Sequence, residues 1–327
     1  MPELSMVDRL EQAVGAVLAG SGLPSVDARL EPLVRIARDL RDLPRPDFKA
    51  RLKADLERKA SMTPRAVRAI PEGFHTITPY LVVEGAAKLI DFMKQAFGAT
   101  EKLRVPLPDG SLMHAEVRIG DSVVELGDAS AEVLPRLAAI HLYVSDADAV
   151  YRRALEAGAT STEEPVDQPY GDREAGVRDA FGNEWYIATH KAAGAGTFIP
   201  EGLRTVTPYL HATGADKMID FLKRAFDAQE IGRDESPAGT IMHAKLRIGD
   251  SIIEMGEAHG AWQPKPTGIH LYVNDTDAIY MRALEAGGTS LREPADQPYG
   301  DRAAGVQDPF GNSWWIATHI RDMPSPA

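Results

Sequence analysis

Two sets of side chains in this sequence could bind a divalent metal ion or transfer protons. Each set has two histidines and one glutamate: His114, Glu125 and His141 in the first, and His243, Glu254 and His270 in the second. Imidazole nitrogens and carboxylate oxygens are common ligands of zinc, iron, manganese and nickel. The two glutamates are also candidate catalytic bases. Because the sequence contains no cysteine, thiolate metal sites, cysteine nucleophiles and disulfides are excluded.

A neighbouring carboxylate gives Glu125 a second candidate role. A two-residue turn at Gly120-Asp121 predicts a hairpin in which Glu116 lies opposite Glu125. Two adjacent carboxylates can share a proton, because their repulsion raises one of the two pKa values. The second set has Lys245 at the position of Glu116. Either the two sites bind different ligands, or this position lies near the rim of a cleft.

The two sets belong to a duplicated domain. Residues 71–190 and 200–319 align without a gap and are joined by a linker at 191–199. A repeat of this length is a whole domain, because solenoid units span roughly 20–50 residues. We therefore expect two tandem domains behind an N-terminal extension at residues 1–65.

Each repeat is expected to contain the order strand, helix and three strands twice. Side chains on a strand alternate between its two faces. In the strand predicted at 113–119, one face is apolar and should pack under a helix: Met113, Ala115, Val117 and Ile119.

Polar and aromatic side chains share the other face of the predicted strands. They are Thr78, Tyr80, His114, Arg118, Glu125, His141, Tyr143 and Tyr186 in the first repeat, and Thr207, Tyr209, His243, Arg247, Glu254, His270, Tyr272 and Trp315 in the second. Trp185 is a further candidate, although alternation points it away from this face. Such a face predicts a ligand cleft, and the alternative is the solvated side of an antiparallel sheet. The loop at 167–173, repeated at 296–302, is expected either to form a lid or to be a turn closed by a salt bridge.

Several segments of both repeats resemble the vicinal oxygen chelate superfamily, which includes glyoxalase I, bleomycin-resistance proteins and extradiol dioxygenases. In the first repeat they are Thr78-Pro79-Tyr80-Leu81, Met113-His114-Ala115, Arg118-Ile119-Gly120-Asp121-Ser122, His141-Leu142-Tyr143-Val144 and Phe181-Gly182-Asn183. The pattern is most similar to the PhnB-like group. The resemblance implies an α+β fold in which each domain has two βαβββ modules that form a cupped mixed sheet.

For the site, the resemblance implies four metal-ligand positions in each domain. They fall at Thr78, Glu125, Ala139 and Tyr186, and at Thr207, Glu254, Gly268 and Trp315. Only the glutamate can ligate in each case, unless a shifted register brings in the histidines. We therefore expect a cofactor-free protein of the bleomycin-resistance type that binds an aromatic or amphipathic organic molecule. A divalent-metal-dependent lyase or isomerase of the glyoxalase type is the alternative.

Composition limits the partners and the location. A net charge of −12 argues against nucleic-acid binding and suits a cationic ligand. No apolar run reaches the roughly 20 residues of a membrane span, and the N-terminus lacks a signal-peptide pattern, so we expect a cytoplasmic protein. In the extension, a helical hairpin is predicted by residues 47–59 and by the stripe Leu30, Leu33, Val34, Ala37 and Leu40. This hairpin is expected to dock a partner or form a homodimer, and a protein that acts only through these helices is the third hypothesis.

Overall fold

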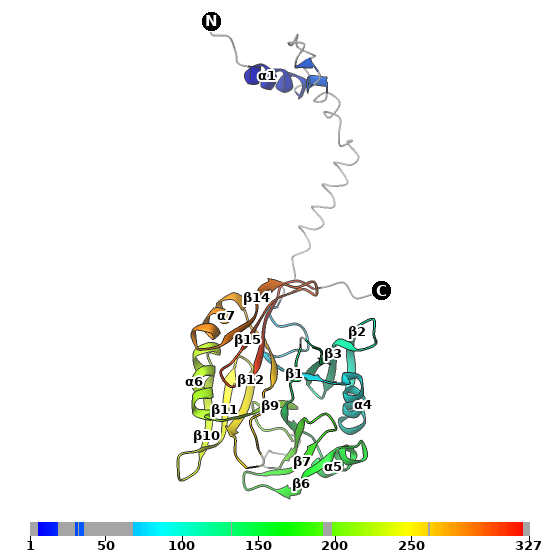
Figure 1. The fold of residues 1–327 in the computed structure, drawn as a ribbon, viewed down its shortest axis with the longest axis vertical. Coiled ribbons are helices and arrows are strands. Elements are labelled where there is room, and N and C mark those ends of the chain that lie inside the picture. The colour runs from blue at the N-terminus through cyan, green and yellow to red at the C-terminus, as the bar shows by residue number, and fades with distance from the viewer. Residues whose placement is uncertain are drawn as a thin grey trace. The chain divides into compact units, whose positions relative to one another are not determined.

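The computed structural model describes residues 6–18, 30–31, 33–35, 68–131, 133–191, 198–260 and 262–322. The chain divides into two compact units, Met1–Ala66 and Val67–Ala327 (Figure 1). In the first unit, the amphipathic helix α1 (Met6–Leu18) buries Ala13 and Val17 against Val34. Among the described residues, no helix is long and apolar enough to span a membrane.

The predicted apolar stripe of the extension is only partly observed. Leu30 and Val34 are buried, whereas Leu33 is 47% exposed. Ala37, Leu40 and the stretch at 47–59 lie outside the described residues.

The second unit has the predicted element order twice over. The first repeat contains β1 (Ile77–Val83), α4 (Ala86–Phe97), β2 (Thr100–Pro106), β3 (Leu112–Ile119), β4 (Ser122–Asp128), β5 (Ala139–Tyr143), α5 (Ala147–Glu156), β6 (Thr160–Asp167), β7 (Asp172–Arg178) and β8 (Glu184–His190). The second contains β9 (Val206–Ala212), α6 (Ala215–Phe226), β10 (Gln229–Glu235), β11 (Ile241–Ile248), β12 (Ser251–Glu257), β13 (Gly268–Tyr272), α7 (Thr276–Glu285), β14 (Thr289–Asp296), β15 (Asp301–Gln307) and β16 (Ser313–His319). The α+β class and the tandem βαβββ modules are thereby confirmed.

Each sheet is built from both repeats. Over the described residues there are two sheets of eight strands, in the orders β14-β15-β16-β13-β1-β4-β3-β2 and β10-β11-β12-β9-β5-β8-β7-β6. The halves meet through antiparallel pairs of β1 with β13 and of β5 with β9. The register places Thr78 opposite His270 and His141 opposite Thr207. Each concave surface therefore combines one module of each repeat.

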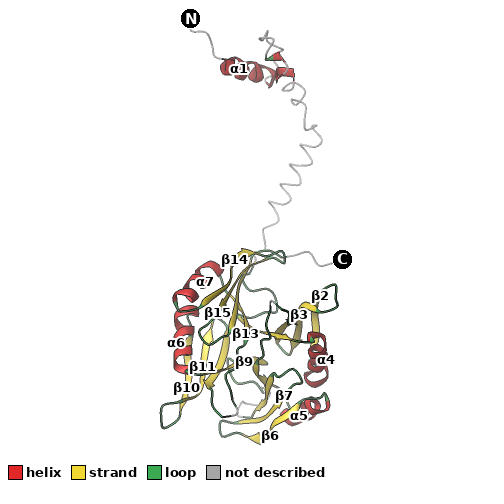
Figure 2. Ribbon diagram, in the orientation of Figure 1, coloured by secondary structure: helices red, strands yellow, loops and turns green. Residues whose placement is uncertain are grey.

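The hydrophobic cores, in contrast, follow the repeats. In the first repeat α4 and α5 pack together, and the rings of Phe97 and Trp185 lie 4.6 Å apart. The second repeat repeats this contact with Phe226 and Trp314, also at 4.6 Å. Figure 2 shows the two helix pairs on opposite sides of the unit, with the strands between them. Each core is thus built almost wholly from one repeat, with one residue from the other (Val206 in the first core and Ile77 in the second), while the two modules of a repeat belong to different sheets.

Two turns join the repeats at equivalent places. Thr76 N donates to Asp250 Oδ1 at 2.8 Å, and the equivalent bond runs from Thr205 N to Asp121 Oδ1 at 3.0 Å. In the turn that contains Asp250, Gly249 has φ +58°, and a Cβ added there would lie 2.3 Å from Thr76 Oγ1. Gly120 has the same φ and the same distance to Thr205 Oγ1. Glycine is needed at both turns, because other residues disfavour this φ and a Cβ would overlap the other repeat.

One prediction from strand alternation is wrong. Met113 is 57% exposed, and Leu112 is buried in its place. The pairing of β2 with β3 is irregular here, since Val105 pairs with His114 and the next residue, Pro106, pairs with Leu112. An extra residue at such a bulge changes which side chain points inward.

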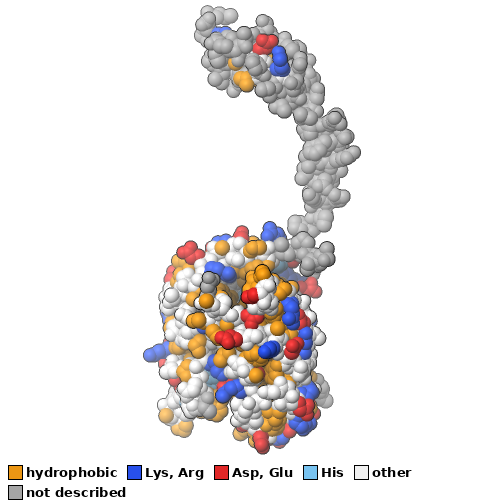
Figure 3. Space-filling model, turned by 45° about the vertical axis from the view of Figure 1, so that its right-hand side comes forward, with side chains coloured by type: hydrophobic (Ala, Val, Ile, Leu, Met, Phe, Trp, Pro, Cys, Tyr) orange, Lys and Arg blue, Asp and Glu red, His pale blue; other side chains and the backbone are white. Residues whose placement is uncertain are grey.

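On the face shown in Figure 3, Lys and Arg are interspersed with Asp and Glu.

Candidate functional site

A cavity of about 450 Å³ lies between the β5–β8 module and the β9–β12 module. Its described lining includes five aromatic side chains: Tyr143, Tyr170, Tyr186, Tyr209 and Trp262. The same lining includes six carboxylates: Glu163, Asp172, Glu174, Asp234, Glu254 and Glu257. Lys245 is the single lysine or arginine among these lining residues. The cavity thus combines an aromatic wall with a strong excess of negative charge, and both repeats contribute to it. We call it the B cleft, and the equivalent surface of the other sheet the A cleft.

A histidine from one repeat and a glutamate from the other form the central contact of each cleft. In the B cleft, His141 Nδ1 lies 2.8 Å from Glu254 Oε2. In the A cleft, His270 Nδ1 lies 2.7 Å from Glu125 Oε2. The two predicted sets are therefore recombined, and the expectation that His141 joins Glu125 is wrong. The physical reason is that β5 pairs with β9, so its cleft-facing side chains meet those of the second repeat.

The His141–Glu254 pair is buried and strongly coupled. Glu254 also lies 3.3 Å from His243 Nε2 and 3.6 Å from Lys245 Nζ. Burial alone would raise the pKa of Glu254, but His141 and His243 hold the pKa far below its ordinary value. Burial alone would lower the pKa of His141, but Glu254 and Glu174 outweigh it and raise the pKa to about 10. Lys245, which corresponds to Glu116 of the first repeat, also lines the cavity. This position therefore belongs to the cleft.

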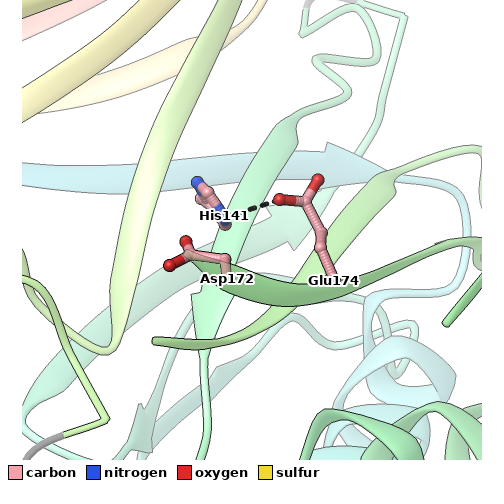
Figure 4. A group of neighbouring side chains, drawn as sticks. All are labelled: His141, Asp172 and Glu174. Atoms are coloured by element: carbon pink, nitrogen blue, oxygen red, sulfur yellow. Dashed lines mark ion pairs between the residues drawn. The ribbon is translucent and has the colours of Figure 1, made fainter. Parts of the chain in front are cut away.

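Two carboxylates on β7 complete the floor of the B cleft. One ligand atom each from His141, Asp172 and Glu174 can be chosen so that all lie within 4.8 Å of one another (Figure 4). Asp172 accepts hydrogen bonds from Tyr143 OH at 3.3 Å and from His190 Nδ1. Sequence reasoning missed both carboxylates, although their spacing of two residues on a strand places them on one face.

The segment at 167–173 has a feature of each of the two alternatives that the sequence left open. Tyr170 lines the cavity, and its hydroxyl donates to Glu174 Oε2 at 2.8 Å. Arg173 forms a bidentate pair with Asp148 at 2.9 Å and lies 3.5 Å from Asp167. The turn therefore contributes an aromatic side chain to the cleft and is also held by a salt bridge.

The aromatic wall has its own hydrogen bonds. Tyr186 OH lies 2.9 Å from His211 Nε2 and 3.2 Å from Glu184 Oε2. The rings of Tyr186 and Tyr209 meet edge to face at 5.7 Å, and Tyr209 stacks with His243 at 5.9 Å. Burial of the His211 imidazole is the main cause that lowers its pKa to about 4. These contacts fix the orientation of both tyrosine rings.

The A cleft differs from the B cleft at several positions besides that of Lys245. Ala303 occupies the position of Glu174, and Arg292 that of Glu163. Trp315 replaces Tyr186, and the Arg292 guanidinium lies over its ring at 5.3 Å. The A cleft therefore lacks the second floor carboxylate.

In the A cleft, several predicted side chains contact one another. The rings of Tyr80 and His114 stack at 5.9 Å, and those of His270 and Tyr272 at 4.4 Å. Glu116 lies opposite Glu125, as predicted. Burial would raise the pKa of Glu116, but contacts with His114 and Lys102 lower it. These contacts favour the charged form of Glu116, whereas a shared proton would require one carboxyl of the pair to hold it.

Five other predicted residues lie away from the cavity lining. Arg118 and Arg247 are exposed near the ends of their strands. Thr78 and Thr207 are buried at the junctions between the repeats. Trp185, the least certain binding candidate, is fully buried, and its indole donates to Asp179 Oδ2 at 3.0 Å.

The ligand positions implied by the family resemblance do not form a metal site. Because the sheets combine repeats, the positions that meet in the B cleft are Thr207, Glu254, Ala139 and Tyr186. Those in the A cleft are Thr78, Glu125, Gly268 and Trp315. Each set has one carboxylate, which already contacts a histidine. One carboxylate, a methyl group or hydrogen, a hydroxyl and an aromatic ring are not a metal-binding set.

Comparisons with known proteins agree with this fold. The model of the Glyoxalase/Bleomycin resistance protein/Dioxygenase superfamily matches residues 73–187 and 210–316. An uncharacterized protein of Mycobacterium tuberculosis is 42% identical over 129 residues, which are 36% of this chain and 76% of that protein. CFP32 of Mycobacterium tuberculosis, a glyoxylase by its name, is 25% identical over 223 residues, 63% of this chain and 80% of that protein.

Solved structures show the same arrangement at low sequence identity. Glyoxalase I from Zea mays has a TM-score of 0.55 and 17% identity, over 74% of this chain and 92% of that one. The fold is thus shared although few residues are. The two family matches span more than half of the chain, which therefore belongs to the glyoxalase/bleomycin resistance protein/dioxygenase superfamily.

Proposed function

We propose that this protein binds a small aromatic or amphipathic organic molecule in the B cleft. The observation that carries the proposal is the cavity of about 450 Å³ with its five aromatic side chains. Pockets for drug-sized ligands span roughly 300–1,000 Å³ and are lined mainly by apolar and aromatic groups. As part of the same proposal, we place the chain in the PhnB-like group.

The negative charge of the B cleft favours a ligand that carries a positive charge. Burial of Glu163, with a smaller contribution from repulsion by Glu174, raises the pKa of Glu163. Six carboxylates face a single lysine among the described lining residues. A positive group on the organic molecule, or a bound metal ion, would relieve this repulsion.

The duplicated sequence supplies a matched control for the test. A set of small aromatic amines and neutral aromatic compounds is screened by thermal shift, and the compounds that bind are titrated by calorimetry. Tyr209→Ala removes the wall of the B cleft, and Tyr80→Ala is the equivalent change in the A cleft. We expect the first to weaken binding at least tenfold and the second to leave it unchanged. Equal loss in both variants, or binding that survives Tyr209→Ala, would contradict the proposal.

A metal-dependent lyase or isomerase is the second candidate function. The four positions of the family do not fit a metal, as described above. The specific observation in favour of a metal is instead the cluster of His141, Asp172 and Glu174. Turnover of a substrate that requires added metal and is lost in Glu174→Ala would establish this candidate.

A further inference from the structure

We propose that His141, Asp172 and Glu174 form a divalent-metal site in the B cleft, at positions other than the four of the family. The proposal concerns the cleft of the organic ligand but does not depend on that ligand. It can therefore be tested with metal alone.

The donor atoms are close together and buried. His141 Nε2 lies 3.6 Å from Glu174 Oε2, and the three donor atoms lie within 4.8 Å of one another. Ligand atoms about 2.1 Å from a tetrahedral metal are about 3.4 Å apart, so only a small inward movement is required. In Figure 4 the two carboxylates project from β7 on the same side, toward the imidazole of β5. All three side chains belong to buried residues.

An independent observation is the second nitrogen of the imidazole. The His141 side chain is 10% exposed, and among the described residues its Nε2 has no hydrogen-bond partner. The distance of 3.6 Å to Glu174 is too long for a hydrogen bond. A buried polar atom without a partner is costly and needs an explanation. A cation at this nitrogen supplies one.

The surroundings match those of metal ligands. A metal-bound histidine almost always donates its other N–H to a carboxylate or carbonyl, and bound carboxylates are themselves hydrogen-bonded. His141 Nδ1 meets Glu254 at 2.8 Å, and Glu174 accepts from Tyr170 OH at 2.8 Å. Asp172 accepts from Tyr143 and His190. The family-position glutamate therefore orients a ligand here and is not itself one.

The charge and the number of donors favour a first-row divalent cation such as zinc or manganese. Two carboxylates neutralise a dication in a buried site, and one imidazole selects against magnesium and calcium, which prefer oxygen ligands. Three protein ligands leave coordination positions open. The A cleft has His270 and Asp301 but Ala303 at the third position, so we assign the metal to the B cleft only.

The test uses the full, untagged chain after treatment with a chelator. Zinc chloride and manganese chloride are titrated in turn by calorimetry, and bound metal is counted by elemental mass spectrometry. We expect one equivalent of at least one of the two metals for the natural sequence. Glu174→Ala should weaken that binding at least a hundredfold. Glu254→Gln should weaken it about 10–100-fold, the usual effect of losing a group that orients a ligand.

Matched variants in the A cleft serve as controls. Glu125→Gln should leave metal affinity unchanged, and the double variant Ala303→Glu with Arg292→Glu should gain a second equivalent. Circular dichroism and thermal melts confirm that each variant is folded. The proposal is overturned if neither metal binds below millimolar concentration, if Glu174→Ala binds as tightly as the natural sequence, or if Glu125→Gln weakens binding as much as Glu254→Gln.

Discussion

The contact between the repeats at Gly249 provides the sharpest stability prediction. Gly249→Ala places a methyl group where the structure has Thr76 of the other repeat. The added Cβ would lie 2.3 Å from Thr76 Oγ1, 2.9 Å from its Cγ2 and 3.0 Å from its Cβ. These atoms belong to a short, buried side chain, so the contact can be relieved only by moving one repeat against the other.

Two terms set the expected cost. An alanine at φ +58° is disfavoured by about 1 kcal/mol relative to glycine. Overpacking in a buried contact costs about 1–3 kcal/mol. The free energy of unfolding should therefore fall by about 2–4 kcal/mol. Gly120→Ala should cost the same amount, because its contact with Thr205 has the same geometry.

The assay is urea unfolding followed by circular dichroism, with Gly239→Ala as the matched control. Gly239 has φ +80°, and an added Cβ would meet nothing within 4 Å. This control isolates the backbone term, so it should lose only about 1 kcal/mol. If Gly249→Ala is no more destabilising than Gly239→Ala, the repeats do not meet at this turn and our description of the junction is refuted.

Three further predictions concern single side chains. In the unfolded chain His211 has an ordinary pKa near 6.5, whereas the folded value is about 4, so protons favour unfolding between these values. The free energy of unfolding should fall by about 1.5 kcal/mol from pH 6.5 to pH 5. His211→Val should remove this part of the pH dependence when both proteins are unfolded in urea at each pH. An identical pH dependence in the two proteins would contradict the assignment. Asp179 accepts four hydrogen bonds at 2.9–3.0 Å, three of them buried. Asp179→Ala should therefore cost about 3 kcal/mol, and so should the equivalent Asp308→Ala. A cost below about 1 kcal/mol in chemical denaturation would refute this role. Leu112→Ala should lower the free energy of unfolding by about 2–4 kcal/mol, and Met113→Ala by less than about 0.5 kcal/mol, because only Leu112 is buried. If thermal melts showed that Met113→Ala is the more destabilising change, the position of the bulge would be wrong.

Much of the local structure could be predicted from the sequence. The two-residue turn at Gly120-Asp121 correctly placed Glu116 opposite Glu125. Alternation also correctly pointed Trp185 away from the cleft, into the core. These features depend on residues that are near in sequence, where strand periodicity is a reliable guide. Alternation failed at Met113, because a bulge inserted one residue and its position left no clear signal in the sequence.

The composition of the clefts could not be predicted, for a reason inherent in the duplication. The two repeats present nearly the same residues, so a strand that can pair with its own repeat can equally pair with the other. His141 has an equivalent glutamate available in each repeat, and only the observed β5–β9 pairing selects Glu254. Asp172 and Glu174 were missed because the segment at 167–173, which includes Asp172, was interpreted as a loop, although both residues lie on β7.

The central claim is that each cleft is assembled from both repeats, and a pair of engineered cysteines tests it most directly. The natural chain has no cysteine, so any disulfide reports only the introduced pair. Leu142 and Val206 are antiparallel partners across the repeats, and such partners have Cα atoms about 4.5–5.5 Å apart, within reach of a disulfide. Ile77 is the equivalent of Val206 within the first repeat. Under mild oxidation, mass spectrometry of peptides should show a disulfide in Leu142→Cys with Val206→Cys and none in Leu142→Cys with Ile77→Cys. A disulfide in the second pair but not the first would show that each repeat closes its own cleft, and would contradict our account.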